Sequence, residues 1–386
     1  MPKELTHWYL AKKVADVILG ASHSTVSYPS LARCIRLAPH AFLLGAVGPD
    51  YLFYYLKGPD REAFRSAAMI LHGRDGGNTL RPLASAVEAY GGRFRVAVGA
   101  FLLGYLAHVA GDAVFHPLVL YTVGKGEGRP QYEHHVFESA LDLYVLKRWG
   151  NEEGALPSLR STLPRPTTRS LPTTLRELTY GMTESGELSR EEFLRLLGVV
   201  SFLGGPYSGK GLRVCLRRYE ILQGWFWSPL ACTATGVLKA LNRNLSFLEA
   251  SCYQRRFYRY SEAFAHTLEY RHPVTGEGRK VRIEDLVNET VEKFLAYAPV
   301  LETLFQKTVT EERRWKGAGT DVGKQEDRGM QGNAGHAMQA EILEGFRSLQ
   351  GPNLETGMVG DRADRILYTR EEGLAGLFGP YGYRYR

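Results

Sequence analysis

Cysteine is scarce in this 386-residue chain, and its four residues lack the close pairing that disulfide frameworks and thiolate metal sites require. They are Cys34, Cys215, Cys232 and Cys252. The opening segment MPKELTH also lacks the basic region, apolar stretch and cleavage site of a secretory signal. We therefore expect ordinary thiols in a reducing compartment and predict a cytoplasmic protein.

Strand-like alternation of apolar and polar residues is also rare. Apolar residues instead recur at intervals of three and four, which is typical of helices packed on a core. This pattern covers residues 5–19, 101–114, 136–146, 191–203 and 283–305. A short hairpin is expected only around 267–281, where HPVTGEG supplies a turn. With 44% hydrophobic and 11% aromatic residues the chain can bury a core, so we predict an all-α, multi-helix bundle.

No long apolar run is free of polar side chains. The longest, around residues 96–120, contains His108, Asp112 and His116, which makes it a poor membrane span. We therefore expect no transmembrane segment. The net charge of +7 favours phosphate groups or anionic surfaces, but it does not distinguish lipid from nucleic acid.

Composition divides the chain into five segments. We expect a metal-binding domain over 1–155, a loop rich in Pro, Ser and Thr over 156–174, and a helical region of unknown role over 175–315. A flexible linker over 316–339 precedes a short helix and a basic-aromatic tail over 340–386. The stretch RRFYRYSEAF in the third segment alternates basic and aromatic residues, so it could contact a membrane interface or stack on nucleic-acid bases, although a solvated helix face over a core is the preferred interpretation.

The segment GYLAHVAGDAVFHP holds the clearest chemical signal. His108, Asp112 and His116 stand four residues apart, so they occupy adjacent turns of one helical face. Burying unpaired charge there is costly, and a divalent cation would offset that cost. The alternative is a core histidine that is hydrogen-bonded and an aspartate that caps a helix.

A second pair follows in QYEHHVFESALD. His134 and Glu138 are also four residues apart, and His134 is favoured over its rival His135, which is three residues from Glu138. Asp142 continues the same face, either as a partner that orients a ligating imidazole or as an exposed helix acid.

Three further candidates lie upstream. His7 opens an amphipathic segment, Asp50 follows a Gly-Pro turn in GAVGPDY, and His72 precedes the Gly-rich turn in ILHGRDGGN. The complete candidate set is His7, Asp50, His72, His108, Asp112, His116, His134 and Glu138. Because these ligands offer nitrogen and oxygen but no sulfur, they suit catalytic rather than structural zinc, although iron or manganese would also accept them.

The order H…PDY…H…HxxxDxxxHP…HxxxE resembles the zinc-dependent phospholipase C family, which is related to the S1/P1 nucleases. The resemblance covers about the first 150 residues and is closest to intracellular relatives. It implies a helical bundle of that type with a C-terminal helical extension, and two or three zinc ions. By this resemblance, one zinc would be held by Asp50, His72, His108 and Asp112, and a second by His116, His134 and Glu138.

The resemblance also implies a third zinc, held by His7, the chain's own amino terminus and a bridging Asp112. The secreted members supply an N-terminal tryptophan, whereas here Trp8 follows the histidine and the Pro2 amine is the alternative ligand. We therefore expect two tightly held ions and a third that is weak or absent. Tyr51 matches the position of an aromatic that helps to enclose the lipid headgroup, so it is a candidate substrate-binding residue.

The predicted function is zinc-dependent hydrolysis of a phosphodiester, with a phospholipid as the substrate implied by the resemblance. Asp50 is the first candidate to accept the proton of the attacking water, and Glu138 is the second. A nuclease-type phosphodiesterase is one alternative. A non-catalytic protein that keeps its metals for folding or partner binding is the other.

Overall fold

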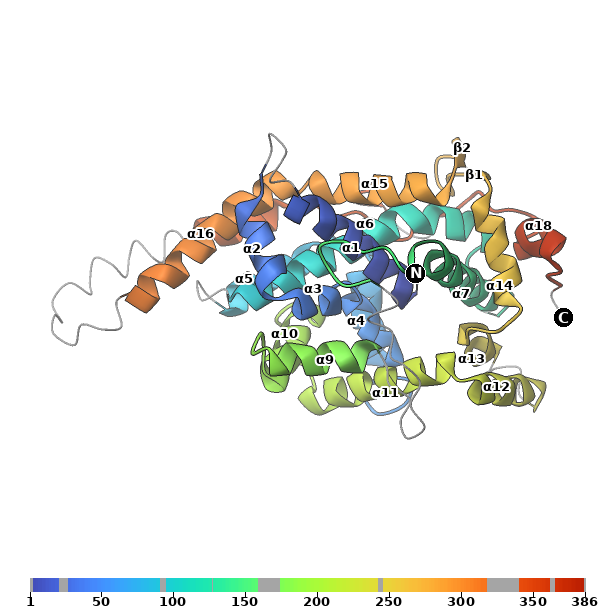
Figure 1. The fold of residues 1–386 in the computed structure, drawn as a ribbon, viewed down its shortest axis with the longest axis horizontal. Coiled ribbons are helices and arrows are strands. Elements are labelled where there is room, and N and C mark those ends of the chain that lie inside the picture. Colours follow the sequence, from blue (N-terminus) through green and yellow to red (C-terminus); the bar gives the residue numbers. More distant parts are fainter. Residues whose placement is uncertain are drawn as a thin grey trace.

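The computed structural model describes residues 3–20, 27–90, 95–126, 128–158, 174–241, 246–317, 340–361 and 365–384. Within these ranges the protein is an all-α bundle with one small β-hairpin, as predicted (Figure 1). The N-terminal elements are α1 (Glu4–Gly20), α2 (Pro29–Leu37), α3 (Pro39–Gly45), the 3-10 helix η2 (Gly48–Tyr54), α4 (Arg61–Leu71), α5 (Arg81–Tyr90), α6 (Val96–Val123) and α7 (Arg129–Trp149).

The second half of the chain wraps around this N-terminal group. Its helices are α9 (Thr174–Glu184), α10 (Arg190–Ser201), α11 (Gly209–Trp227), α12 (Pro229–Leu241), α13 (Ser246–Ser251), α14 (Phe257–Tyr260), η4 (Ser261–Ala265), α15 (Ile283–Leu295), α16 (Ala298–Gly317), α18 (Leu374–Phe378) and η7 (Gly379–Tyr381). In Figure 1, α9 to α12 lie below α6, and α15 and α16 lie above it.

Helix α6 runs through the middle of the bundle and packs against α1, α2, α3, α7 and α15. It is longer than the predicted 101–114 because Pro117 does not end it. Pro117 has no N–H for the Ala113 carbonyl, and Gly357 approaches that carbonyl so closely that an added Cβ would lie 2.4 Å from it. By length and hydropathy α6 is the one described helix that could span a membrane, but its most apolar stretch is wholly buried in the protein.

Helices α3 and α6 touch backbone to backbone through two glycines. A Cβ added to Gly104 would lie 1.9 Å from the Phe42 carbonyl oxygen, and one added to Gly45 would lie 2.0 Å from that of Phe101. Only glycine fits at such a crossing. The close approach matters for the site, because the next carbonyl at this contact, that of Ala46, accepts a hydrogen bond from His108.

Two predictions about the second half have different outcomes. The hairpin is confirmed: β1 (Leu268–Arg271) and β2 (Gly278–Val281) pair antiparallel, with Leu268 opposite Val281. The single helix over 283–305 is wrong, because α15 and α16 are separate helices. Pro299 lies in the first turn of α16, where its missing N–H and fixed φ are tolerated, whereas a helix interior would not accept it.

The C-terminal segment packs on the N-terminal elements. The Leu354 amide donates to the His72 carbonyl, and Thr79 Oγ1 donates to the Pro352 carbonyl. Farther along, the buried Tyr383 hydroxyl donates to Glu133 on α7. Most of the predicted loop over 156–174 and of the linker over 316–339 lies outside the described residues. The five-segment division stays a prediction.

None of the four cysteines forms a disulfide in the described structure, which agrees with the ordinary thiols predicted from the sequence. Cys34, Cys215 and Cys252 are buried, and Cys232 is partly exposed. The cellular location predicted from the sequence stays a prediction.

Candidate metal centre

Helix α6 supplies three side chains at the middle of the site. Its His108, Asp112 and His116 are all buried, and their spacing of four residues places them on one face. Helix α7 brings His134 and Glu138 to the same region, where the rings of His116 and His134 lie 5.8 Å apart. The structure thus gathers side chains that the sequence separates by up to thirty residues.

Asp112 stands between two sets of imidazoles. Its Oδ2 lies 3.2 Å from His108 Nε2 and 3.8 Å from His72 Nε2. Its Oδ1 lies 3.3 Å from His7 Nε2 and 3.8 Å from His116 Nε2. One carboxylate therefore presents a separate oxygen to each side, which is the arrangement of a bridging ligand.

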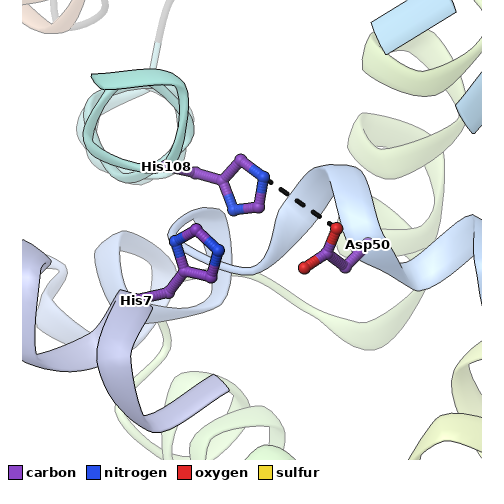
Figure 2. A group of neighbouring side chains, drawn as sticks. All are labelled: His7, Asp50 and His108. Carbon is purple, nitrogen blue, oxygen red and sulfur yellow. Dashed lines mark ion pairs between the residues drawn. The ribbon is translucent and has the colours of Figure 1, made fainter. Parts of the chain in front are cut away.

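Three groups, two of which share His108, each have ligand atoms that lie within 4.8 Å of one another, close enough to surround an ion. They are His7, Asp50 and His108; His72, His108 and Asp112; and His116, His134 and Glu138. All eight residues predicted as metal ligands belong to one of these groups. The first group joins α1, η2 and α6, and Figure 2 shows its three side chains pointing toward one another.

Backbone carbonyls fix the orientation of two imidazoles. His108 Nδ1 lies 3.0 Å from the Ala46 carbonyl oxygen, and His72 Nδ1 lies 2.7 Å from that of Ala68. Because a carbonyl can only accept, each ring holds its proton on Nδ1 and turns the Nε2 lone pair toward the centre. His72 Nε2 then lies 3.4 Å from Asp50 Oδ1.

The choice between His134 and His135 is resolved by geometry. His134 Nε2 lies 2.7 Å from Glu138 Oε1 and belongs to the third group. His135 Nδ1 lies 3.6 Å from the other oxygen, Oε2, and belongs to none of the three groups. Both rings are partly exposed, at 23% and 30%, so this side of the centre is its most accessible part among the ligands.

The protonation states of three imidazoles suit metal binding. Burial lowers the pKa of the His7, His116 and His134 imidazoles, which keeps them neutral near pH 7. Burial alone would lower the pKa of His108, but the nearby carboxylates of Asp112 and Asp50 outweigh burial and raise this pKa.

The carboxylates of Asp112 and Glu138 favour the ionised form. Burial acts to raise the pKa of Asp112, but the His116 and His108 rings hold it well below its ordinary value. The pKa of Glu138 is likewise held low by His134 against the effect of burial. Neutral imidazoles and charged carboxylates are the forms that ligate divalent cations.

A metal also accounts for polar atoms that nothing else satisfies. In the described part of the chain, buried side-chain atoms without a hydrogen-bond partner are concentrated here: both ring nitrogens of His7 and His116, both oxygens of Asp112, Asp50 Oδ1 and His108 Nε2. Buried polar atoms are normally paired, and each unpaired one costs about 1–3 kcal/mol. The donor set and its unpaired lone pairs therefore fit a cluster of divalent ions such as zinc.

Asp142 is fully buried, so its interpretation as an exposed helix acid is wrong. In the described structure its hydrogen bonds go to α1 and to Tyr253 rather than to an imidazole, so it orients a ligand indirectly. Its carboxylate accepts hydrogen bonds from the amides of Leu5 and Thr6, from Thr6 Oγ1 and from the Tyr253 hydroxyl. Burial and the nearby Glu4 carboxylate raise its pKa to about 7. Asp142 orients the first turn of α1, and through it His7.

Tyr51 does not lie where the resemblance placed it. Its side chain is fully buried, its hydroxyl donates to the Leu44 carbonyl, and its ring packs on Phe193 and Tyr219. The expectation that Tyr51 contacts the headgroup is therefore wrong in this structure. A 3-10 helix has three residues per turn, so the residue that shares a face with Asp50 is Phe53, whose ring lies 5.2 Å from that of His72.

A buried polar network beside the metal centre was not predicted from the sequence. The buried Glu4 carboxylate lies 3.2 Å from the Tyr54 hydroxyl and 3.4 Å from that of Tyr253. The Lys3 ammonium donates to the Ser251 carbonyl and lies over the Tyr253 ring. The one local signal was the charged pair Lys3 and Glu4 at the start of α1, just before the apolar residues that the helix buries. Pro2, the alternative ligand for a third zinc, lies outside the described residues.

Comparison with known proteins agrees with this geometry. The model of the family described as zinc dependent phospholipase C matches residues 6–199, which include all eight candidate ligands. No curated protein and no solved structure matches the chain.

Proposed function

Because this chain belongs to the zinc-dependent phospholipase C family, we propose that it hydrolyses the phosphodiester of a phospholipid on the glycerol side of the phosphate. The products would be a diacylglycerol and a phosphorylated headgroup. The coarser activity, that of a zinc-dependent phosphoesterase, is supported by the family match and by the three ligand groups.

The observation that carries the proposal is the position of Asp112. Its two oxygens face different imidazoles at 3.2–3.8 Å, and neither oxygen has a hydrogen-bond partner in the described structure. A fully buried carboxylate in that state needs positive charge on both sides. A protein stabilised by a single structural ion would need no such bridge.

Zinc, when bound, would neutralise phosphate oxygens and lower the pKa of a water molecule in the centre. The protein's own groups then have defined tasks. The neutral rings of His7 and His116 would hold the ions without adding charge, and Asp112 would offer one oxygen to each side. We assign two ions to the buried groups and regard the third, at the amino terminus, as weak.

Asp50 is the better proton acceptor for the attacking water. Its Oδ1 has no hydrogen-bond partner, and the residue is slightly exposed, at 7%. Glu138 faces His134 on one oxygen and His135 on the other, so it is the second candidate. As the water oxygen bonds to phosphorus, its proton passes to the carboxylate and the phosphorus–glycerol oxygen bond breaks. The departing glycerol oxygen then takes up the proton that the carboxyl group gives back.

Elemental analysis combined with a substrate panel tests the function. We expect two zinc ions per purified chain, and turnover of phosphatidylcholine and of bis(p-nitrophenyl) phosphate that is lost on chelation and restored by zinc. Turnover of single-stranded DNA in preference to both would favour the nuclease alternative. Full zinc content without turnover of any phosphodiester would favour a non-catalytic role.

A further inference from the structure

Helix α12 presents an apolar stripe to solvent. Its buried face contains Thr235, whose hydroxyl donates to the Cys232 carbonyl, while Leu230 and Val237 are 84% and 59% exposed. Leu230, Ala234 and Val237 are spaced by four and three residues, so they share one helical face, and all three are exposed. A surface helix of a soluble protein normally turns its apolar face toward the core and its polar face toward solvent.

Helix α11 extends this apolar surface. Its Ile221 and Trp225, four residues apart, are 47% and 45% exposed. Only Ser228 separates α11 from α12, and the two helices pack together. Aliphatic side chains next to an exposed tryptophan are the usual composition of a surface that enters a lipid interface.

Positive charge adjoins the stripe. A surface cavity of about 690 Å³ is lined by Arg255, Arg256, Tyr258 and Arg259. Arg256 pairs with Glu249 on α13, which packs against α12, whereas Arg255 and Arg259 are exposed and have no carboxylate partner in the described structure. Two uncompensated guanidinium groups beside an apolar stripe match the charge of anionic phospholipid headgroups.

The apolar stripe and the arginine cavity are anchored to the helix that carries the accessible ligands. Trp227, at the end of α11, stacks on Tyr253 at 4.1 Å, and the Tyr253 hydroxyl donates to Asp142 on α7. Arg256 Nη2 lies 3.3 Å from the hydroxyl of Tyr132, two residues before His134. In Figure 1, α12, α13 and α14 lie at the same end of the molecule as α7.

From these observations we infer that the exposed face of α11 and α12, with the arginine cavity beside it, docks on the surface of an anionic phospholipid bilayer. We call this surface the α12 face: Ile221, Trp225, Leu230, Ala234, Val237, Arg255 and Arg259. This inference rests on the proposed function, because a phospholipid substrate resides in a bilayer. Docking there holds the accessible side of the metal centre near the lipid.

Cosedimentation of the zinc-loaded full-length protein with vesicles tests the inference. We expect binding to vesicles of phosphatidylcholine mixed with phosphatidylglycerol, and weaker binding to phosphatidylcholine alone. Leu230→Ser should weaken partitioning about tenfold, since it removes one inserted aliphatic side chain. Arg255→Gln should weaken binding to the anionic vesicles about fivefold and leave binding to the zwitterionic ones nearly unchanged.

Leu367→Ser is the matched control. Leu367 is 73% exposed, but its amide bonds to the Pro273 carbonyl beside the β-hairpin, at the other side of the molecule from α12 in Figure 1. It should bind vesicles as the wild type does. Equal loss in Leu367→Ser and Leu230→Ser would overturn the inference, as would wild-type binding by Leu230→Ser. A wild-type dimer in solution that Leu230→Ser dissociates would assign the face to a second copy instead.

Turnover of soluble bis(p-nitrophenyl) phosphate distinguishes a loss of membrane binding from a loss of catalytic activity. It should be unchanged in Leu230→Ser, while turnover of vesicle phospholipid falls with binding. If the wild type binds vesicles through the α12 face but cleaves no phosphodiester, the proposed function fails and the docking surface stands. If it cleaves the soluble diester and binds no vesicle, the docking surface fails and phosphoesterase activity stands.

Discussion

Asp142 on α7 caps the first turn of α1 by accepting hydrogen bonds from both the amide and the hydroxyl of Thr6, at 2.9 and 2.6 Å. Thr6 directly precedes His7, one of the candidate zinc ligands. The same helix, α7, carries His134 and Glu138. One buried carboxylate thus fixes the position of a ligand from α1 relative to two ligands from α7.

Replacing this cap should therefore affect both stability and metal content. Asp142→Ala leaves the Leu5 and Thr6 amides and the Thr6 hydroxyl without their acceptor, so we expect a loss of about 3 kcal/mol in the free energy of unfolding. Chemical denaturation of the zinc-loaded protein measures it. Asp16→Ala, which removes an acceptor for the exposed Ala155 amide at the other end of α1, should cost much less. Equal losses would show that the cap has no special role.

Asp112→Asn should reduce activity more than any other single ligand substitution. A neutral amide cannot balance two cations, and its NH₂ group cannot bind a metal. Groups that merely orient ligands cost about 10- to 100-fold when removed, so we expect a loss of kcat/KM beyond a hundredfold. Asp75→Asn, at an exposed pair with Arg81, is the control. Zinc content and kcat/KM equal to those of wild type in Asp112→Asn would rule out the bridge.

The two neighbouring histidines of α7 should behave differently. His134→Ala removes a member of the third ligand group, so we expect the loss of about one zinc ion per chain and of most activity. His135→Ala, whose ring lies 3.6 Å from Glu138, should retain both ions. Zinc analysis of the two variants under identical purification decides the assignment, and loss of metal from His135→Ala alone would reverse it.

The close contact between α3 and α6 should tolerate no side chain at Gly104. A methyl group there would lie 1.9 Å from the Phe42 carbonyl oxygen, so Gly104→Ala must force the helices apart, at a cost of about 3 kcal/mol. Gly236→Ala in α12 is the control, since nothing lies within 4 Å of the added methyl group. The control should raise stability by about 0.5–1 kcal/mol. Thermal unfolding of both variants measures the difference.

Zinc should leave the centre in two steps as the pH falls. Surrounding carboxylates raise the pKa of His108, so protons compete with the metal there from above pH 6.5 downward. Burial lowers the pKa of His116 and His134, so their group should keep its ion to a lower pH. Dialysis against a chelator at a series of pH values, followed by zinc analysis, follows both steps. Loss in the reverse order would contradict the assigned protonation states.

The sequence predicted the ligands on α6 and α7 because their spacing is local. A step of four residues fixes relative positions within one helix, whatever surrounds it. The convergence of His7, Asp50 and His72 on that helix could be predicted only from the family resemblance, since no short-range pattern connects them. The all-α class could also be predicted from local spacing, because apolar residues recur at intervals of three and four.

Features that depend on packing between distant elements were missed. The role of Asp142 depends on where α1 ends, and no spacing rule gives the distance between α1 and α7. Tyr51 was assigned by its place next to Asp50, but the tight turn of η2 directs adjacent side chains to different sides. The apolar part of the α12 face was missed because an apolar stripe at helical spacing predicts burial, and the sequence does not say on which side the helix packs. Its two arginines lie in the RRFYRYSEAF stretch, for which a membrane contact was one of the interpretations.

The hydrogen bond from the Leu354 amide to the His72 carbonyl has a consequence for how the protein matures. The segment around Leu354 thus supports the turn that carries His72, a ligand from a distant part of the sequence. During synthesis this support is missing until the chain has been made up to Leu354. Closing so long a loop costs more entropy than closing a short one, so the contact forms late in folding. The turn at His72 therefore gains its final support only after the helices that carry the other ligands have been synthesised.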